Sequence, residues 1–517
     1  MTMKIELLPE PKIEFANNFI CDDPKQGISV AGFYSQSNHT HRSEINYAII
    51  GTNQHIQDLK DWVDKIGNRI EATKSEVAVI DEAQIEEGEV LSLFDREQLK
   101  SIEVVNETFS VNKKLNPDFP GFNKNTMFNC EFQNDVTNNV AIKAAELEGI
   151  MTAKEKKLEK LEGIIAIYVE AYNKLIDTFI TKPDICFLII PSDVFKKLAS
   201  IPFGNQHINM RRKLKATLMT VGETQIPVQI VLEDTIRGAK KQMQDFSMIA
   251  WNFSVAQYYK TANCVPWALT DIDKDTCFVG ISFHKVINEK NDLLRSSIAQ
   301  AFNREGKGLV FIGKQFEWDS SKTQVSAPHL RYEYARELII SVLKQYQRTN
   351  NHIPKRVVIY KTTDFWDAFT NRDYAEIEGF KEGMKEELGT EVNSDLVTIK
   401  NSKINLYRTV GRYPVLRGTN FILDDFRSVL YTTGYIPYFE TFPGVHMPSG
   451  LSVEIFDGET TLRNVCREIL ALTKLNFNNC NYYDSLPITL KFAQRVGEII
   501  QYLNEGVVPP SKYYFYM

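Results

Sequence analysis

A short apolar run, residues 277–281 (Cys-Phe-Val-Gly-Ile), most constrains what this chain folds into. It follows a charged stretch at 270–275 and has the length of a strand. A continuous apolar run after a polar turn is typical of a central strand that is buried on both faces. A second run, Ile-Cys-Phe-Leu-Ile-Ile at 185–190, is closed by Pro191. Both runs predict parallel-type strands within α/β layers.

The chain is too long for a single core. With 517 residues we expect two domains or more. A hydrophobic content of 43% and a charged content of 24% argue against disorder. No run approaches the roughly 18 apolar residues that a membrane helix needs, and the N-terminus MTMKIELLPEPKIEF lacks the apolar stretch of a signal peptide. We therefore expect a cytoplasmic protein with no membrane association.

Cysteine spacing and net charge remove several function classes. The seven cysteines form no CxxC pair, which supports neither a disulfide framework nor a zinc site, so most are expected to be small buried hydrophobes. The net charge of −6 gives no argument for nucleic-acid binding. Any phosphate binding must come from a local basic cluster.

The first half of the sequence predicts an α/β layer. A strand at 45–52 leads into an amphipathic helix at 55–66. Residues 71–125 are polar and acidic and are interpreted as a surface excursion or a partner-facing loop. The span 139–180 has a helical pattern with Lys/Glu pairs three and four residues apart. Further elements are predicted as a helix at 209–216, a strand at 225–232 and a helix at 247–259.

The second half predicts a mixed sheet with helices. We expect strands near 277–284, 308–316, 356–361, 395–408, 413–423, 427–432 and 451–456, and helices near 329–347, 372–387, 460–473 and 487–503. Antiparallel strands followed by alternating strands and helices suit an RNase H-like layer. The periodicity alone does not distinguish it from other α/β folds.

Several separate blocks are more specific than this pattern. The blocks are residues 256–260 with 265–269 and 277–281, then 356–363, and finally 472–478 with 486–493. In this order they resemble the MID-to-PIWI junction and the PIWI domain of short prokaryotic Argonautes. The resemblance covers about residues 180–517 well and the first 180 loosely. It implies an α/β chain with an N-terminal segment and Rossmann-like MID domain at 1–255, and an RNase H-like PIWI domain at 256–517.

The resemblance also implies a pocket for the 5′ phosphate of a guide strand. Lys215, Gln229 and Lys260 match the family positions, and Arg211 lies one helical turn before Lys215. The C-terminal carboxylate of Met517 would help to hold a structural Mg²⁺ together with the phosphate. Such a set suits a doubly charged phosphate. Without the resemblance, the same residues would be interpreted as solvated helix charges and a strand-end glutamine.

The positions of the family's catalytic acids carry other residues here. Ser282, Thr362 and Gln494 occupy three of them, and a hydroxyl or an amide does not replace a carboxylate against Mg²⁺. We therefore predict that cleavage chemistry is absent and that this is not an enzyme. Asp364, Asp367 and Asp484 are candidates for a shifted metal site, although surface roles are favoured for them. The histidines at 284, 329 and 446 are interpreted as packing or backbone-contact residues.

Without cleavage chemistry, the predicted function is recognition of nucleic acid. Candidate contacts to a nucleic-acid backbone are Lys285, Arg408, Arg412 and Arg417. The resemblance implies a guide RNA, a target single-stranded DNA and a partner protein that carries an APAZ region fused to a SIR2, TIR or nuclease effector, acting in prokaryotic immunity against plasmids or phage. Two alternatives stay open: a guide-dependent nuclease with a non-standard metal site, and a nucleic-acid-binding protein that acts without a partner.

Overall fold

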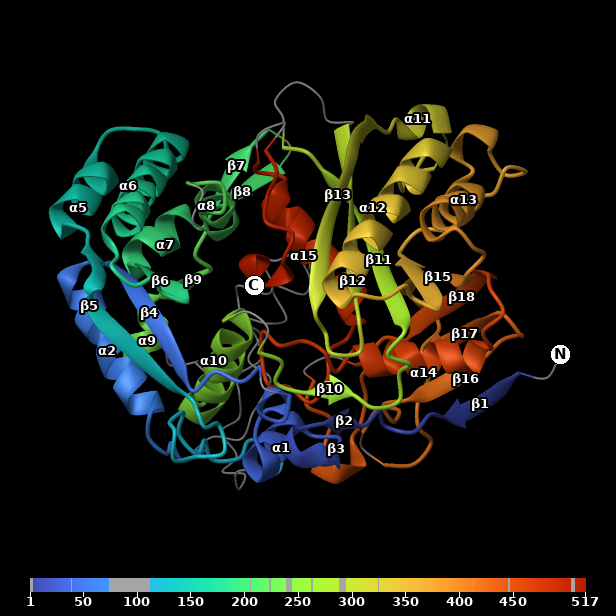
Figure 1. Ribbon diagram of the computed structural model, residues 1–517, viewed down its shortest axis with the longest axis horizontal. Coiled ribbons are helices and arrows are strands. Elements are labelled where there is room, and N and C mark those ends of the chain that lie inside the picture. Colours follow the sequence, from blue (N-terminus) through green and yellow to red (C-terminus); the bar gives the residue numbers. More distant parts are fainter. Residues whose placement is uncertain are drawn as a thin grey trace.

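Two β-sheets, each with helices on both faces, form the framework of the computed structural model (Figure 1). The structure describes residues 3–38, 40–73, 112–204, 206–222, 225–238, 244–261, 264–287, 294–323, 325–411, 413–444, 447–503 and 507–517. The fold is mixed α/β, as the sequence predicts.

The smaller sheet is entirely parallel, with the strand order β5-β4-β6-β9. Its strands are β4 (Glu44–Gly51), β5 (Glu131–Ala141), β6 (Ile185–Ile190) and β9 (Val228–Leu232). Every residue of β6 is buried, because helices cover both faces of this central strand. The apolar run at 185–190 is thereby explained, and its prediction as a buried parallel strand is confirmed.

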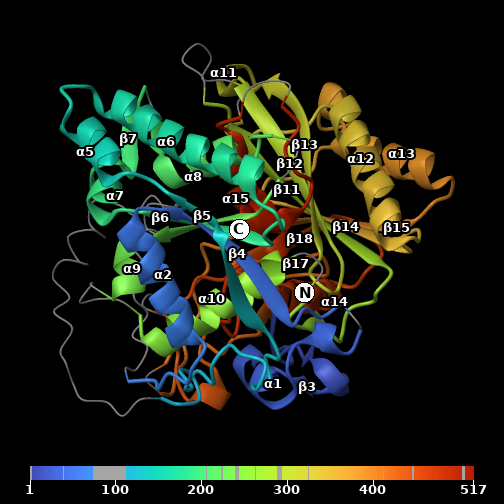
Figure 2. The same ribbon diagram turned by 60° about the vertical axis from the view of Figure 1, so that its left-hand side comes forward.

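Helices cover the two faces of this sheet separately (Figure 2). One face packs against α2 (Asn53–Ile66) and α10 (Phe246–Lys260), and the other against α6 (Lys157–Thr178), α7 (Ser192–Leu198) and α8 (Met210–Leu218). Thr52 starts α2 by accepting a hydrogen bond from the backbone N–H of His55. The remaining elements here are α5 (Ala144–Thr152), α9 (Glu233–Arg237) and a hairpin of β7 (Ser200–Phe203) and β8 (Gln206–Asn209).

The larger sheet has nine strands in the order β1-β16-β17-β18-β15-β14-β11-β12-β13. Its strands are β1 (Lys4–Leu7), β11 (Thr276–Lys285), β12 (Leu294–Phe302), β13 (Gly308–Glu317), β14 (Arg356–Lys361), β15 (Asn393–Asn401), β16 (Thr419–Ile422), β17 (Arg427–Leu430) and β18 (Leu451–Asp457). The first seven residues of β11 are buried, which confirms the central strand predicted at 277–284. It pairs in parallel with β14 and antiparallel with β12.

Helices again lie on opposite faces of the larger sheet (Figure 1). The helices α12 (Tyr332–Asn350) and α13 (Glu376–Leu388) pack on one face, and α14 (Leu462–Leu472) and α15 (Ile488–Ile500) on the other. The short α11 (Ser320–Thr323) precedes α12. Helix α15 approaches β11 so closely that a Cβ on Gly280 would lie 2.4 Å from the carbonyl oxygen of Thr489. Only glycine fits there.

The N-terminal segment belongs to the larger sheet rather than to the smaller one. Strand β1 pairs antiparallel with β16 and forms the far edge of the sheet. A three-stranded sheet of β10 (Ala268–Leu269), β2 (Ile13–Glu14) and β3 (Ile20–Cys21) follows, with α1 (Pro24–Ala31) beside it. The predicted boundary between residues 255 and 256 falls inside α10, whose side chains are buried on nearly every side.

Three other expectations differ from the structure. The helical span predicted from residue 139 begins as the end of β5, and the strand predicted at 395–408 ends at Asn401. Strand β12 was not predicted, because its first half contains Arg295, Ser296 and Ser297 and has no apolar run. These differences all concern segments of mixed polarity.

The segment 71–125 was predicted to be a surface loop, and residues 74–111 lie outside the described part. Its end is buried: Phe119 and Phe122 are at most 1% exposed and pack against Phe128. Phe119 also meets Trp251 of α10 edge to face and forms a β-bridge with Ile70. That part of the prediction is wrong, because the aromatic residues at 119–122 are part of the core.

The cysteines form no disulfide among the residues that the structure describes. All seven cysteines are free; six are buried and Cys21 is half-buried. None of the helices that the structure describes has both the length and the apolar composition needed to cross a lipid bilayer.

A buried ion pair joins the end of β14 to the start of α13. Lys361 Nζ lies 2.6 Å from Glu376 Oε2, and both side chains are fully buried. His329 Nδ1 lies 3.0 Å from the same oxygen, and the backbone N–H of Leu330 donates to the other oxygen at 2.9 Å. Burial opposes ionisation of Glu376, but the charge of Lys361 and the contact with His329 outweigh it, so the pKa of Glu376 is lowered.

We expect Glu376→Ala to lower the free energy of unfolding by about 3–5 kcal/mol, because it leaves Lys361 buried without its counter-charge. The matched control is Glu391→Ala, which removes an exposed pair with Lys385 and should cost about 1 kcal/mol or less. Chemical denaturation measures both values. Equal losses in the two variants would contradict a structural role for the buried pair.

Candidate nucleic-acid interface

Lys215, Gln229 and Lys260 meet between the two sheets. Lys215 lies on α8, Gln229 on β9 and Lys260 at the last position of α10. Lys260 Nζ donates a hydrogen bond to Gln229 Oε1. The amide nitrogen of Gln229 donates to the carbonyl of Ile230 at 3.0 Å, which turns its oxygen toward the lysine. The structure therefore brings together three of the residues predicted for the phosphate pocket.

The two lysines are both buried, and their charges influence each other. Lys260 is 1% exposed and Lys215 is 8% exposed. Burial, followed by the positive charge of Lys215, holds the pKa of Lys260 well below its usual value. Two ammonium groups in a sheltered position disfavour each other, and a bound anion with more than one negative charge relieves that repulsion. The arrangement is therefore suited to binding a phosphate.

Two arginines on α8 flank this lysine pair. The guanidinium of Arg211 lies 5.3 Å from the ring centroid of Phe195, one helical turn before Lys215. Arg212 pairs with Glu498 of α15 at 2.7 Å and so ties the smaller sheet to the larger one. Arg211 shares helix α8 with Lys215, and so lies on the same element as one lysine of the pair.

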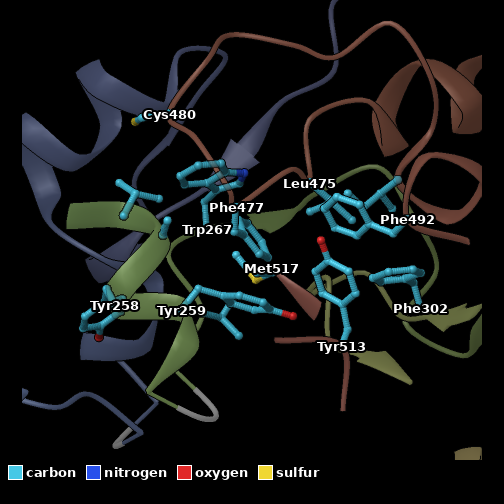
Figure 3. Packing of buried hydrophobic residues seen from close by; sticks show 14 of the residues in the cluster. Tyr258, Tyr259, Trp267, Phe302, Leu475, Phe477, Cys480, Phe492, Tyr513 and Met517 are labelled. Carbon is cyan, nitrogen blue, oxygen red and sulfur yellow. The ribbon is translucent and has the colours of Figure 1, made fainter. Parts of the chain in front are cut away.

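The C-terminus is tucked into the centre of the molecule (Figure 1). The last turn, η5 (Tyr513–Tyr516), packs against α10, α15 and β13. Tyr513 stacks on Phe492 with ring centroids 3.9 Å apart, and the side chain of Met517 is 9% exposed. Figure 3 shows Met517 within the same aromatic cluster as Tyr259, the neighbour of Lys260 in sequence. The chain end therefore lies in the region where α10 ends.

The three degenerate catalytic positions come from neighbouring elements. Ile281 pairs with Lys361, so Ser282 and Thr362 occupy the next register position of two adjacent parallel strands. Gly280 faces α15 and side chains alternate along a strand, so Ser282 faces α15 as well. Gln494 lies on α15 and is half-buried. Ser282 and Thr362 therefore lie on adjacent strands, and Gln494 lies on the helix that packs against β11.

His284 fills the space beside Ser282. Its Nε2 lies 3.0 Å from the hydroxyl of Ser282, and its ring packs against Gly497, where a Cβ would lie 1.8 Å from the imidazole. Burial lowers the pKa of His284 to about 4, although a hydrogen bond with the backbone of Ala493 acts in the opposite direction and raises it. The ring is neutral at pH 7, so it is a packing residue, as predicted. His329 packs as well, stacking on Trp366 at 3.8 Å, while His446 lies outside the described residues.

The nearby acids do not form a metal site among the residues that the structure describes, where no three His, Cys, Asp or Glu side chains come together. Asp364 pairs with Lys400, and both are at least two-fifths exposed. The surface role favoured for Asp484 is wrong, because it is 9% exposed and bonds to Lys491 and Asn476.

The carboxyl ends of four strands meet at one edge of the larger sheet. Strands β11, β14 and β15 are parallel, and two antiparallel pairings give β17 the same direction. We call this end of the strands the C-terminal edge of the larger sheet. It consists of the residues that follow β11, β14, β15 and β17 and of those that precede β16. At ~4.8 Å per strand spacing, it runs about 24 Å from β11 to β16.

The predicted backbone contacts lie along this C-terminal edge. Lys285, the last residue of β11, is exposed, and Arg408 is exposed after β15. Arg412 lies outside the described residues. Arg417 differs from its prediction, because its side chain is 1% exposed.

The guanidinium of Arg417 bonds within the protein, to Glu10 at 2.9 Å and to the hydroxyl of Thr473 at 2.9 Å. Lys474 holds the same carboxylate at 2.6 Å. Arg417 therefore anchors the N-terminal segment and has no exposed face for a nucleic-acid backbone. No local pattern indicates this burial, because Glu10 is distant from Arg417 along the chain.

Comparisons with known proteins bear on the fold. No protein-family model and no curated protein matches the sequence. The fold is similar to that of Clostridium butyricum Argonaute bound to a guide DNA and a 19-mer target DNA, with a TM-score of 0.60, 16% identity and coverage of 99% of this chain and 55% of that chain.

Two further solved structures agree. Drosophila Piwi has a TM-score of 0.57, 11% identity and coverage of 99% of this chain and 56% of that chain. Marinitoga piezophila Argonaute in complex with a 5′ OH guide RNA has a TM-score of 0.54, 14% identity and coverage of 99% and 59%. The chain spans somewhat more than half the length of these proteins and has the MID–PIWI fold of Argonautes.

We expect the stability of the free protein to rise with pH because of Lys260. Its pKa is lowered in the folded state, so the unfolded state binds more protons between that lowered value and the usual value of 10.5. Stability therefore increases as the pH rises through this window. Lys260→Met should flatten the rise measured by chemical denaturation from about pH 7 to pH 10.

The control for this measurement is Lys213→Met, which removes a lysine of α8, the helix of Lys215, that is paired with Glu162. This variant should keep the pH dependence of the unmodified protein. If Lys260→Met keeps the same increase of stability with pH, then the pKa of Lys260 is not lowered in the folded protein, which would contradict this prediction.

Proposed function

We propose that this protein binds a 5′-phosphorylated guide strand, by resemblance an RNA, and recognises complementary single-stranded DNA by base pairing. The observation that carries the proposal is the buried pair of Lys215 and Lys260 with Gln229 between β9 and α10. Two cations and an amide form charge-assisted hydrogen bonds with a terminal phosphate. A 5′-hydroxyl offers no charge to this pair.

The similar solved structures support a guide in general terms. One is an Argonaute bound to a guide DNA and a target DNA, and another is an Argonaute in complex with a 5′ OH guide RNA. Guide chemistry thus differs among proteins of this fold. For this chain, the two buried ammonium groups favour the phosphorylated form.

A structural Mg²⁺ at the guide's 5′ end is part of the proposal. The C-terminal carboxylate of Met517 would supply one oxygen ligand, and hard cations require several. The described side chains provide no group of three that could hold a metal by themselves. The guide phosphate and water would therefore have to complete the coordination.

Recognition without cleavage is the second part of the proposal. Ser282, Thr362 and Gln494 carry no charge, and Ser282 is hydrogen-bonded to a neutral histidine. Two-metal cleavage requires carboxylates that bridge the ions. The effector activity is assigned to an APAZ-containing partner of the SIR2, TIR or nuclease type, in prokaryotic immunity within the cytoplasm, and this assignment rests on the sequence resemblance.

We expect Lys215→Met with Lys260→Met to weaken binding of a 5′-phosphorylated guide by about 10- to 100-fold, because charge-assisted hydrogen bonds to the phosphate are lost. A 5′-hydroxyl guide of the same sequence should lose much less. Fluorescence anisotropy with labelled guides measures both affinities, and Lys213→Met serves as the surface control. Equal losses for the two guides would place the 5′ end elsewhere.

We expect no guide-directed cleavage when the purified protein is incubated with guide, target and Mg²⁺ or Mn²⁺, because the degenerate positions hold no carboxylate. Denaturing electrophoresis of the labelled target is the measurement. Cleavage that is lost with Asp364→Ala or Asp484→Asn would instead establish the alternative, a nuclease with a non-standard metal site.

A further inference from the structure

One exposed segment at the C-terminal edge combines positive charge with aromatic rings. Between Asp395 and Asp424 the sequence has no acidic residue and five basic ones: Lys400, Lys403, Arg408, Arg412 and Arg417. Lys403 and Arg408 are exposed in the structure. Lys400 is paired with Asp364, and Arg417 is buried against Glu10. Lys403 and Arg408 therefore supply the exposed positive charge of this segment, which favours a polyanion in a chain with a net charge of −6.

Within this region an arginine and two tyrosines form a stack. The rings of Tyr413 and Tyr435 are stacked with centroids 4.7 Å apart and planes 28° apart. The guanidinium of Arg408 lies 5.3 Å from the centroid of Tyr435. Tyr413 is 40% exposed, so part of its side chain is open to solvent. These three residues are called the arginine–tyrosine stack.

The backbone around the stack is held in place. The hydroxyl of Tyr431 accepts a hydrogen bond from the backbone N–H of Leu406 at 2.7 Å and donates to the carbonyl of Ile404 at 3.1 Å. The backbone N–H of Tyr435 donates to the carbonyl of Val415 at 2.9 Å, which ties Tyr435 to the segment that carries Tyr413. A rigid aromatic surface loses little conformational entropy when a planar ligand stacks on it.

The stack lies along the same edge as the degenerate catalytic positions. Residues 402–418 connect the end of β15 with the start of β16, and Tyr435 follows the end of β17. Ser282 and Thr362 lie at the corresponding ends of β11 and β14. A strand of nucleic acid held along the C-terminal edge would therefore pass both features.

We propose that the arginine–tyrosine stack is a stacking site for an unpaired base of single-stranded nucleic acid. The ring of Tyr413 would carry the base, while Arg408 stiffens the stack and Lys403 and Arg408 attract the adjoining phosphates. Stacking on aromatic rings beside basic groups is how proteins hold single strands without reading their sequence. The absence of acidic residues between Asp395 and Asp424 favours this ligand over a protein surface. The proposal rests on the proposed nucleic-acid function.

The test measures target binding by the full-length, guide-loaded protein. We expect Tyr413→Ala to weaken binding of a labelled DNA target that extends beyond the paired region by about 5- to 100-fold, and Tyr413→Phe to remain within about 3-fold of the unmodified protein. Phe426→Ala is the control and should bind normally, because it removes an exposed ring from the turn between β16 and β17, at the opposite end of these strands from the C-terminal edge. Arg408→Gln should also weaken binding.

Abasic sites separate stacking from charge and identify the strand. If a base stacks on Tyr413, an abasic site at one position of either the target or the guide should weaken binding to the unmodified protein and remove the difference caused by Tyr413→Ala. A loss that persists with every abasic strand would overturn the proposal. Normal nucleic-acid binding by Tyr413→Ala, with lost association of a partner protein, would overturn it in favour of protein docking.

Failure of the stack is distinguishable from failure of the proposed function. If only the stack is wrong, Tyr413→Ala binds guide and target normally, while Lys215→Met with Lys260→Met still loses the phosphorylated guide. If the proposed function is wrong, the unmodified protein shows no guide-dependent target binding.

Discussion

The burial of Lys260 beside Lys215 is the interaction on which the functional account depends. Removing an ammonium group from water and placing a second one near it opposes folding. Among the described contacts, a neutral amide, that of Gln229, is the hydrogen-bond partner of Lys260. Such an arrangement is unfavourable in the free protein and favourable once an anion is bound. This asymmetry is characteristic of binding sites rather than of structural ion pairs such as Lys361–Glu376.

The fold places this pair where the two sheets meet. Helix α10 packs on the smaller sheet and ends at Lys260, and η5 of the chain's last residues contacts the same helix. Arg212 on α8 pairs with Glu498 on α15, the helix that covers β11. A ligand at the lysine pair would therefore lie beside elements that continue to the C-terminal edge of the larger sheet. The central strand β11 carries Ser282 and His284, whose side chains are hydrogen-bonded to each other.

Sequence reasoning predicted the elements whose burial is local. The runs at 185–190 and 277–281 are buried on both faces, so their composition alone indicates central strands. Strand β1 has four residues and exists through its pairing with β16, which is far away in sequence. The burial of Arg417 by Glu10 and of Phe119 by Trp251 depends on equally distant contacts. No periodicity within a segment carries that information.

The candidate site was predictable only in part for the same reason. Lys215, Gln229 and Lys260 lie on three different elements, and composition alone gave no reason to bring them together; the resemblance to short Argonautes did. Of the arginine–tyrosine stack, the sequence analysis singled out Arg408 but neither tyrosine. Tyr435 follows a different strand from Tyr413, so their contact is not visible in the sequence. The sequence does show a basic stretch with tyrosines and no acidic residue. The strand order is needed to see that this stretch lies at the C-terminal edge of the larger sheet.

The most direct test of the central claim is an experimental structure of the protein bound to a 5′-phosphorylated guide and a complementary target. The account predicts the 5′ phosphate within hydrogen-bond distance of both Lys215 Nζ and Lys260 Nζ, with the nucleic acid continuing toward the C-terminal edge of the larger sheet. A guide whose 5′ phosphate lies away from these two lysines, with Lys260 still bonded to Gln229 alone, would contradict it.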